Sequence, residues 1–415
     1  MLTTRAVQDL SLVTAGTPWA RRCALLGALA LGSLGCADDG PTGDDEVGAP
    51  ETETSPETEG SGESTESTES TSTSTESAES TESTESTDST ETDTTESSET
   101  GGGPPPRLPL CGTAPPEGAE LAPPLPTYAG ECPGFIPGEM NVFDTGGGAR
   151  EFILVAPTDI REGEELPVMF MYHWLGASAN SFFNKAEVQY AADYYRFIAV
   201  IPEGREVEDL VPFKWPFAVS DLDFIMEEDF QMFDDVLACV AEQYSVDKEC
   251  VSAMGVSAGA MFTSMLASRH GERLSSMISL SGGVGGLIKP WQAGGNVMPA
   301  LVLWGGRDDF CILIDFAVAS VELEEVLEAN GHPVLECIHN CTHATPPFEV
   351  PEDQPELPTF APAWEFMLAH PYWLEDGYSP YDDYDELPSP WPDWCAMGAG
   401  AAMERVGECG GSECQ

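Results

Sequence analysis

The sequence has few basic residues for its length. Its 415 residues include 16 Lys or Arg against 72 Asp or Glu, which gives a formal net charge of −56 at pH 7. A surface this acidic repels the phosphates of nucleic acids and the headgroups of anionic membranes. The composition therefore argues against a nucleic-acid partner.

Long hydrophobic runs are also lacking. The apolar run near the N-terminus, from Cys23 to Leu34, spans 12 residues. This is too short for a membrane-spanning helix and is typical of a signal peptide. The run ends in SLGC (33–36), which resembles a bacterial lipobox and implies lipidation of Cys36. We therefore expect a signal peptide at 1–36 and membrane contact only through a lipid anchor, with cleavage and free secretion as the alternative.

Residues 37–103 contain no Lys or Arg and little apolar surface. This segment has 21 Asp or Glu within drifting Ser-Thr-Glu triplets. Such a composition cannot bury enough apolar area to offset chain entropy. We expect a disordered, acidic linker at 37–103, which leaves one folded domain at 104–415.

Metal-binding patterns are missing from the ten cysteines of this domain. No Cys-x-x-Cys pair is combined with a second pair or with nearby histidines, and no acidic run has the spacing of a calcium loop. We therefore predict no metal and no cofactor. An even number of cysteines outside the cytoplasm predicts up to five disulfides, and the local pairs Cys111–Cys132 and Cys239–Cys250 are our first choices.

The domain alternates short apolar runs with helix-like stretches. This alternation predicts an α/β fold, with a mainly parallel sheet covered by helices on both faces. Expected strands lie at 151–156, 166–172, 197–202, 250–254, 277–281, 300–304 and 333–338. Expected helices lie at 186–195, 230–244, 258–270, 316–330 and 361–369, and residues 371–415 form an irregular tail tied by disulfides.

One strand-to-helix transition carries a Gly-x-Ser-x-Gly motif. Gly255, Ser257 and Gly259 follow an apolar strand and open a helix, as in a nucleophile elbow. A serine hydroxyl needs a neighbouring imidazole to take its proton, and a carboxylate to orient that imidazole. Backbone N–H groups must also stabilise the oxyanion, and the N–H of Ala258 is expected to be one of them.

The remaining partners follow in the order serine, acid, histidine. Asp308 and Asp309 come after the strand at 300–304, and His339 and His343 come after the strand at 333–338. This is the chain order of α/β-hydrolases. The second oxyanion donor is expected from the loop that begins at His173.

Several of these segments resemble the esterase branch of the α/β-hydrolases, which includes secreted polyhydroxybutyrate depolymerases and feruloyl or acetylxylan esterases. The segments are LPVMFMYHWLGASANS (166–181), FIAVIPEGR (197–205), GVSAGAMF (255–262), LVLWGGRDD (301–309) and AWEFMLAHP (363–371). The resemblance implies an α/β-hydrolase fold over about residues 150–372.

Position by position, the resemblance implies Ser257 as nucleophile, Asp308 as acid and His343 as base. Asp309 and His339 remain as rivals. It also implies the N–H of Leu175 as the second oxyanion donor. One departure is Trp174, which stands where the family has a glycine and would either disturb that donor or line a pocket.

Two further features bear on the site. A disulfide from Cys311 to Cys341, or to Cys337 as second choice, would tie the acid and base loops together. The aromatic and acidic insertion at 211–230 would either shape the substrate cleft or form an ordinary surface loop.

These features predict an extracytoplasmic serine carboxylic-ester hydrolase that acts on polymer-linked esters, either feruloyl or acetyl esters of polysaccharide or polyhydroxyalkanoates. The alternatives are a non-catalytic binding module on the same fold and a serine peptidase.

Overall fold

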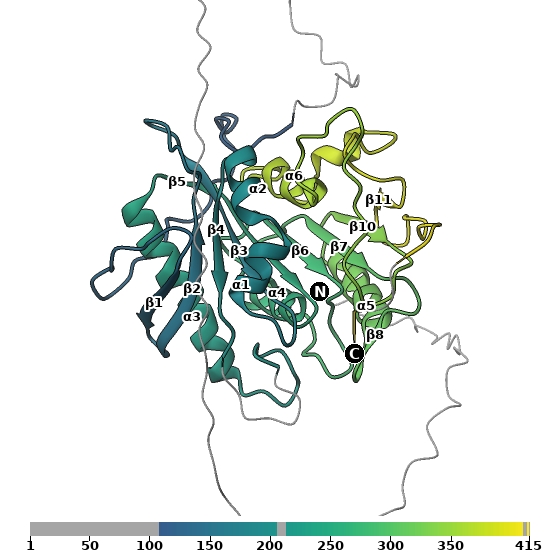
Figure 1. Ribbon diagram of the computed structural model, residues 1–415, viewed down its shortest axis with the longest axis horizontal. Coiled ribbons are helices and arrows are strands. Elements are labelled where there is room, and N and C mark those ends of the chain that lie inside the picture. The colour runs from purple at the N-terminus through teal and green to yellow at the C-terminus, as the bar shows by residue number, and fades with distance from the viewer. Residues whose placement is uncertain (1–107, 206–212, 410–412, 415) are drawn as a thin grey trace, which may run out of the picture. The chain divides into compact units, whose positions relative to one another are not determined.

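The computed structural model describes residues 108–205, 213–409 and 413–414 (Figure 1). The predicted signal peptide, Cys36 and the predicted linker at 37–103 lie outside these described residues.

The helices are α1 (Ala179–Lys185), α2 (Val188–Tyr195), α3 (Asp223–Gln243), α4 (Ala258–His270), α5 (Phe316–Ala329) and α6 (Ala361–Ala369). The strands are β1 (Met140–Thr145), β2 (Gly148–Val155), β3 (Leu166–Tyr172), β4 (Ile198–Pro202), β5 (Val246–Val256), β6 (Ser276–Leu280), β7 (Ala300–Trp304), β8 (Phe310–Cys311), β9 (Ile314–Asp315), β10 (Val334–Ile338) and β11 (Cys395–Met397).

A nine-stranded sheet in the order β1-β2-β4-β3-β5-β6-β7-β10-β11 forms the centre of the domain (Figure 1). The strands from β4 to β10 in this order run parallel to one another. β2 and β11 join the two ends of this parallel set in the antiparallel sense, and β1 pairs antiparallel with β2. The predicted mainly parallel α/β sheet is confirmed.

Alternate side chains of each strand pack on opposite faces of the sheet, as the two-residue period of a strand requires. On β3, Val168 and Phe170 belong to one buried cluster, together with apolar residues of α3, α4 and α5. Met169 and Met171 belong to a second cluster, with residues of α1, α2 and α6. Helices therefore cover both faces, and β3 is buried along its whole length because it lies between them. Among the described helices, none is long and apolar enough to cross a membrane.

The structure differs from the predicted elements in one additional helix, in additional strands and in the ends of some elements. α1 is an additional helix, and it begins where the Ser178 hydroxyl accepts the N–H of Ser181. α3 begins at Asp223, several residues before the predicted start. The antiparallel β1 and β11 were not predicted, because neither has a long apolar run. Both lie at an edge of the sheet, where one side of the strand needs no partner.

Five disulfides join the described residues, and the number agrees with the prediction. They are Cys111–Cys250, Cys132–Cys239, Cys311–Cys414, Cys337–Cys395 and Cys341–Cys409. The predicted pairs Cys111–Cys132, Cys239–Cys250 and Cys311 with Cys341 or Cys337 are wrong. The bonds join the segment before β1 to β5 and α3, and the C-terminal tail to β10 and to the loops after β7 and β10.

The loops that follow β5, β7 and β10 all emerge at the carboxyl end of the parallel strands. β7 and β10 are direct neighbours, with Trp304 opposite Ile338, whereas β6 separates β7 from β5. Side chains from these three loops can therefore meet above the same edge of the sheet.

Candidate active site

Ser257 lies at the turn between β5 and α4. Its backbone has a φ of 54° and a ψ of −117°, a conformation that strains a residue with a side chain. A Cβ atom on Gly259 would collide with the Tyr172 carbonyl, and one on Gly255 would collide with the backbone of Gly259. The two glycines are therefore required for β3 and α4 to pass this close to the turn.

The imidazole of His343 joins the Ser257 hydroxyl to a carboxylate. His343 Nδ1 lies 2.7 Å from Asp309 Oδ1, and His343 Nε2 lies 2.9 Å from Ser257 Oγ. An ionised carboxylate can only accept hydrogen bonds, so Nδ1 carries the proton and Nε2 is left to accept from the hydroxyl. This tautomer is the one that a general base for the serine requires.

The carboxylate of Asp309 is fully buried and is held from several sides. Its Oδ2 accepts the N–H of Gly305 and the hydroxyl of Ser281, each at 2.8 Å. The imidazole of His343 also stacks on the ring of Phe316, with 4.3 Å between ring centroids. These contacts fix both groups and leave little freedom for the His343–Asp309 pair.

The structure brings Asp309 to His343, and not Asp308, the residue predicted for this position. The Asp308 side chain is 75% exposed, and its ion pair is with the neighbouring Arg307. The two aspartates diverge because the chain turns at Gly306, where the N–H of Asp309 bonds back to the Gly306 carbonyl. This turn directs the second aspartate toward the sheet and leaves the first in solvent.

His339, the rival base, is hydrogen-bonded within its own loop, and the hydrogen bond to Ser257 is made by His343 instead. It is fully buried, and its Nδ1 accepts the N–H of Cys341 at 3.1 Å. Burial lowers the pKa of His339 to about 4, so the ring is neutral. Its backbone N–H bonds to Trp304 and continues the pairing of β10 with β7. Of the two histidines after β10, the structure brings only His343 to Ser257.

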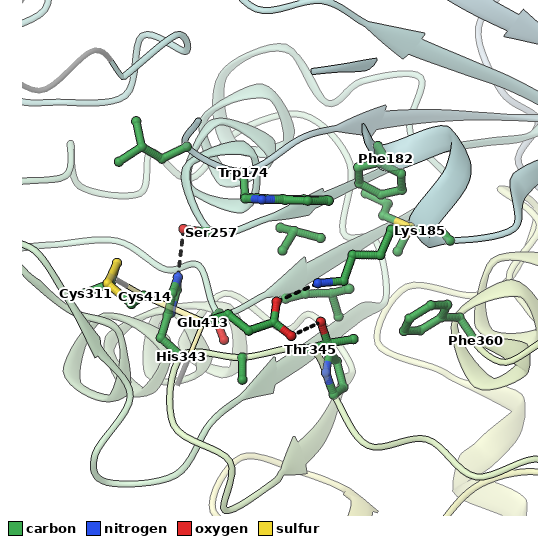
Figure 2. A pocket seen from close by; sticks show the side chains of 18 of the residues that line it. Trp174, Phe182, Lys185, Ser257, Cys311, His343, Thr345, Phe360, Glu413 and Cys414 are labelled. Atoms are coloured by element: carbon green, nitrogen blue, oxygen red, sulfur yellow. Dashed lines mark hydrogen bonds and ion pairs between the residues drawn. A yellow bond between two sulfur atoms is a disulfide. The ribbon is translucent and has the colours of Figure 1, made fainter. Parts of the chain in front are cut away.

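The loop after β3 and the start of α4 present two backbone N–H groups beside Ser257. Ala258 is the first residue of α4, and Leu175 lines the same pocket as the serine. Within the described residues, neither N–H donates to a protein acceptor. The side chain of Trp174 lies along the pocket wall above Lys185 (Figure 2).

His173 holds the peptide group between Trp174 and Leu175. Its Nε2 accepts the N–H of Gly204 at 3.1 Å, so its proton is on Nδ1, which donates to the Trp174 carbonyl at 2.9 Å. Burial lowers the pKa of His173 and keeps the ring neutral. In a trans peptide the N–H points opposite to the C=O. The hydrogen bond from His173 therefore directs the Leu175 N–H away from His173.

The insertion at 211–230 supports this loop and does not line the pocket at Ser257. Residues 211 and 212 lie outside the described residues, and α3 begins within the rest. Trp215 is buried, and its indole N–H donates to the His173 carbonyl at 2.8 Å. In the described part of the insertion, no residue reaches the pocket. The expectation that the insertion shapes this cleft directly is therefore wrong for the described residues.

A pocket of about 190 Å³ opens over Ser257 and His343 (Figure 2). Its walls are mostly apolar and include Trp174, Phe182, Met254, Leu280, Pro346 and Phe360. Apolar walls with a few placed polar groups are typical of small-ligand sites. In the part of the chain that the structure describes, no group of three or more His, Cys, Asp or Glu is arranged to hold a metal ion.

Four polar residues that line the pocket were not predicted from the sequence: Lys185, Ser281, Thr345 and Glu413. Ser281 follows β6 and bonds to Asp309, while Lys185 at the end of α1 pairs with Glu413 of the C-terminal tail. Ser281 could have been found, since it follows a strand like the other site residues. No sequence signal places Glu413 in the pocket, because its position depends on the pairing of Cys414 with Cys311.

Residues 152–338 match the family model described as Esterase PHB depolymerase. Two similar solved structures are complexes of pOPH variants, one with DMSO and one with pNPB. Both have a TM-score of 0.51 and 14% identity, and the alignments cover 66% and 68% of this chain and 98% and 99% of those chains. Native sOPH is 17% identical over 69% of this chain and 98% of that chain, with a TM-score of 0.48. At such identities the solved structures show the fold alone. No curated protein matches the chain.

Proposed function

Because residues 152–338 match the family model described as Esterase PHB depolymerase, we propose that the chain is a serine carboxylic-ester hydrolase acting through an acyl-enzyme. The observation that carries the proposal is the continuous hydrogen-bond chain from Ser257 through His343 to the buried Asp309. Ser257, at one end of this hydrogen-bond chain, has a strained backbone and lines an apolar pocket, where an ester can bind next to its hydroxyl.

In the first half-reaction, Ser257 Oγ attacks the ester carbonyl carbon while its proton passes to His343 Nε2. Asp309 stabilises the resulting imidazolium. The tetrahedral intermediate then collapses, the bond to the alcohol oxygen breaks, and the leaving alkoxide takes the proton from Nε2. The products of this half-reaction are the free alcohol and an ester of Ser257.

In the second half-reaction, water attacks the acyl-enzyme while His343 takes a proton from it. The second tetrahedral intermediate expels Ser257 Oγ, which receives that proton back, and the carboxylic acid leaves. In both intermediates the negative oxygen is assigned to the N–H groups of Leu175 and Ala258. Each such donor typically lowers the barrier by about 3–4 kcal/mol.

The proposed substrate is an ester carried on a polymer, either a polyhydroxyalkanoate or a feruloyl or acetyl ester of polysaccharide. The family description supports the first, and a tether at Cys36 followed by the acidic linker would suit a surface-bound polymer. Five disulfides support a location outside the cytoplasm, where such bonds persist. Mass spectrometry of the mature N-terminus tests the anchor, since an unmodified Cys36 would contradict it.

The test of the function compares the full-length chain with its Ser257→Ala variant. We expect release of p-nitrophenol from p-nitrophenyl acetate and butyrate, and loss of this activity in the variant. A panel of methyl ferulate, acetylated xylan, polyhydroxybutyrate and a peptide amide then identifies the substrate class. Equal rates for the two proteins on all esters would contradict the proposal, and cleavage of the amide alone would favour a peptidase.

A further inference from the structure

Two oppositely charged side chains that line the pocket, Lys185 and Glu413, form an ion pair. Lys185 Nζ lies 2.5 Å from Glu413 Oε2, and the other carboxylate oxygen accepts the hydroxyl of Thr345 at 2.8 Å. Figure 2 shows Lys185 extending beneath Trp174 toward Glu413, which lies between His343 and Thr345. The Lys185 ammonium also lies 5.3 Å from the centroid of the Trp174 ring.

Glu413 is a fixed part of this wall. The next residue, Cys414, is bonded to Cys311, and the Glu413 N–H donates to the carbonyl of His343 at 3.1 Å. Burial disfavours the charge on this carboxylate, but the hydrogen bonds from Lys185 and Thr345 lower the pKa of Glu413 overall. The carboxylate is therefore ionised, and it faces the only cation that lines the pocket within the described residues.

We infer that Glu413 is a specificity-determining residue, which neutralises Lys185 and restricts the pocket to esters with an uncharged acyl group. Without Glu413, the Lys185 ammonium beneath Trp174 would be a recognition site for a second carboxylate, as in the monoester of a dicarboxylic acid. The protein's own carboxylate occupies that position instead. The inference rests on the proposed esterase function and concerns which esters the same site accepts.

The size of the effect follows from Coulomb's law. Two unit charges a few ångströms apart interact more weakly in water than in a partly buried site. The Lys185 and Glu413 side chains are 41% and 51% exposed, which places the pair near the weaker limit. A change of roughly tenfold in the preference between neutral and anionic esters is therefore expected, and it should shrink in high salt.

The experiment uses a double-mutant cycle on the full-length chain. The substrates are p-nitrophenyl hexanoate and p-nitrophenyl hydrogen adipate, which have acyl chains of equal length but differ in one carboxylate. The readout is the ratio of kcat/KM for adipate over hexanoate. We expect Glu413→Gln to raise this ratio about tenfold and Lys185→Gln to lower it, with the double variant within about twofold of the wild type.

Two controls separate the alternatives. Asp223→Asn removes a carboxylate that pairs with Lys289 outside this pocket, so it changes the net charge equally and should leave the ratio unchanged. The same cycle on the Ser257→Ala background, read as binding of dimethyl and monomethyl adipate by calorimetry, does not depend on turnover.

Failure of the inference and failure of the function look different. If the single variants keep the wild-type ratio, or shift it in the same direction, the role of Glu413 is wrong while hexanoate turnover still supports an esterase. If no ester is hydrolysed, the proposed function is wrong, and the binding cycle alone decides whether Glu413 excludes a second carboxylate.

Discussion

The Nδ1–H of His173 donates a hydrogen bond to the carbonyl of Trp174, and this carbonyl belongs to the same peptide group as the N–H of Leu175. One buried imidazole thus controls the direction of a proposed oxyanion donor. The indole of Trp174 lines the pocket, while the hydrogen bond from His173 is made to the Trp174 backbone carbonyl. Trp174, which stands where the resembling esterases have a glycine, is therefore compatible with the proposed direction of the Leu175 N–H.

Replacement of His173 tests this positioning role. We expect His173→Ala to lower kcat by up to about 10³-fold, the cost of losing one oxyanion donor, with a smaller change in KM. His173→Asn retains an N–H near the position of Nδ1 and should recover part of kcat. A merely structural role would lower the melting temperature of both variants without this difference in kcat.

The choice between the two aspartates of the acid loop gives a second test. Asp309→Asn should reduce kcat by about 10⁴-fold, because the amide can donate to Nδ1 and stabilise the wrong tautomer of His343. Asp308→Asn changes an exposed side chain and serves as the matched control, with kcat expected to stay within about twofold. The measurement is kcat for ester hydrolysis by both variants. A larger loss of kcat in Asp308→Asn than in Asp309→Asn would identify Asp308 as the acid.

A buried carboxyl pair beneath the acid loop predicts a pH-dependent stability. Glu324 on α5 accepts from the indole of Trp304, while Glu336 on β10 accepts the N–H of Ala402. Burial, together with the Glu336 carboxylate, raises the pKa of Glu324 to about 9. The folded protein therefore holds a proton that the unfolded chain releases near pH 4.5.

The direction of the change in stability with pH follows from which state binds more protons. Between about pH 4.5 and pH 9 the folded state binds more protons at Glu324, so the free energy of unfolding falls as the pH rises through this window. Glu324→Gln keeps a neutral side chain at every pH and should flatten the decline in urea-unfolding midpoints from pH 5 to pH 9. The exposed neighbour Glu325 gives the control Glu325→Gln, which should retain the wild-type slope.

The disulfides allow stability to be separated from activity. Removing Cys311–Cys414 or Cys111–Cys250 by paired serine substitutions should each cost about 2–4 kcal/mol of stability, since both close long loops. Only the first holds Glu413 in the pocket. We therefore expect a change in the adipate-to-hexanoate ratio for the Cys311–Cys414 variant alone, measured well below its melting temperature. An equal change in both variants would indicate a general loosening of the domain.

The parts of the site that could be predicted from sequence depend on local patterns. Ser257 lies between a strand and a helix that form from adjacent residues, and His343 follows the last parallel strand. The choice between Asp308 and Asp309 could not be predicted, because it depends on the direction of one turn at Gly306. The disulfide partners and the position of Glu413 depend on how segments 58 to 139 residues apart in sequence come together, and no local sequence pattern predicts that.

The strand order has a mechanical consequence for the site. Asp309 and His343 follow neighbouring strands, β7 and β10, whereas Ser257 follows β5, with β6 in between. A small shift between each pair of neighbouring strands would add up over three strand pairs from β5 to β10, but over one pair from β7 to β10. Such shifts would therefore move Ser257 relative to His343 more than His343 relative to Asp309. The Ser257–His343 hydrogen bond should therefore break more easily than the His343–Asp309 hydrogen bond. We expect ester hydrolysis to decline at urea concentrations that leave the tryptophan emission of the folded domain unchanged.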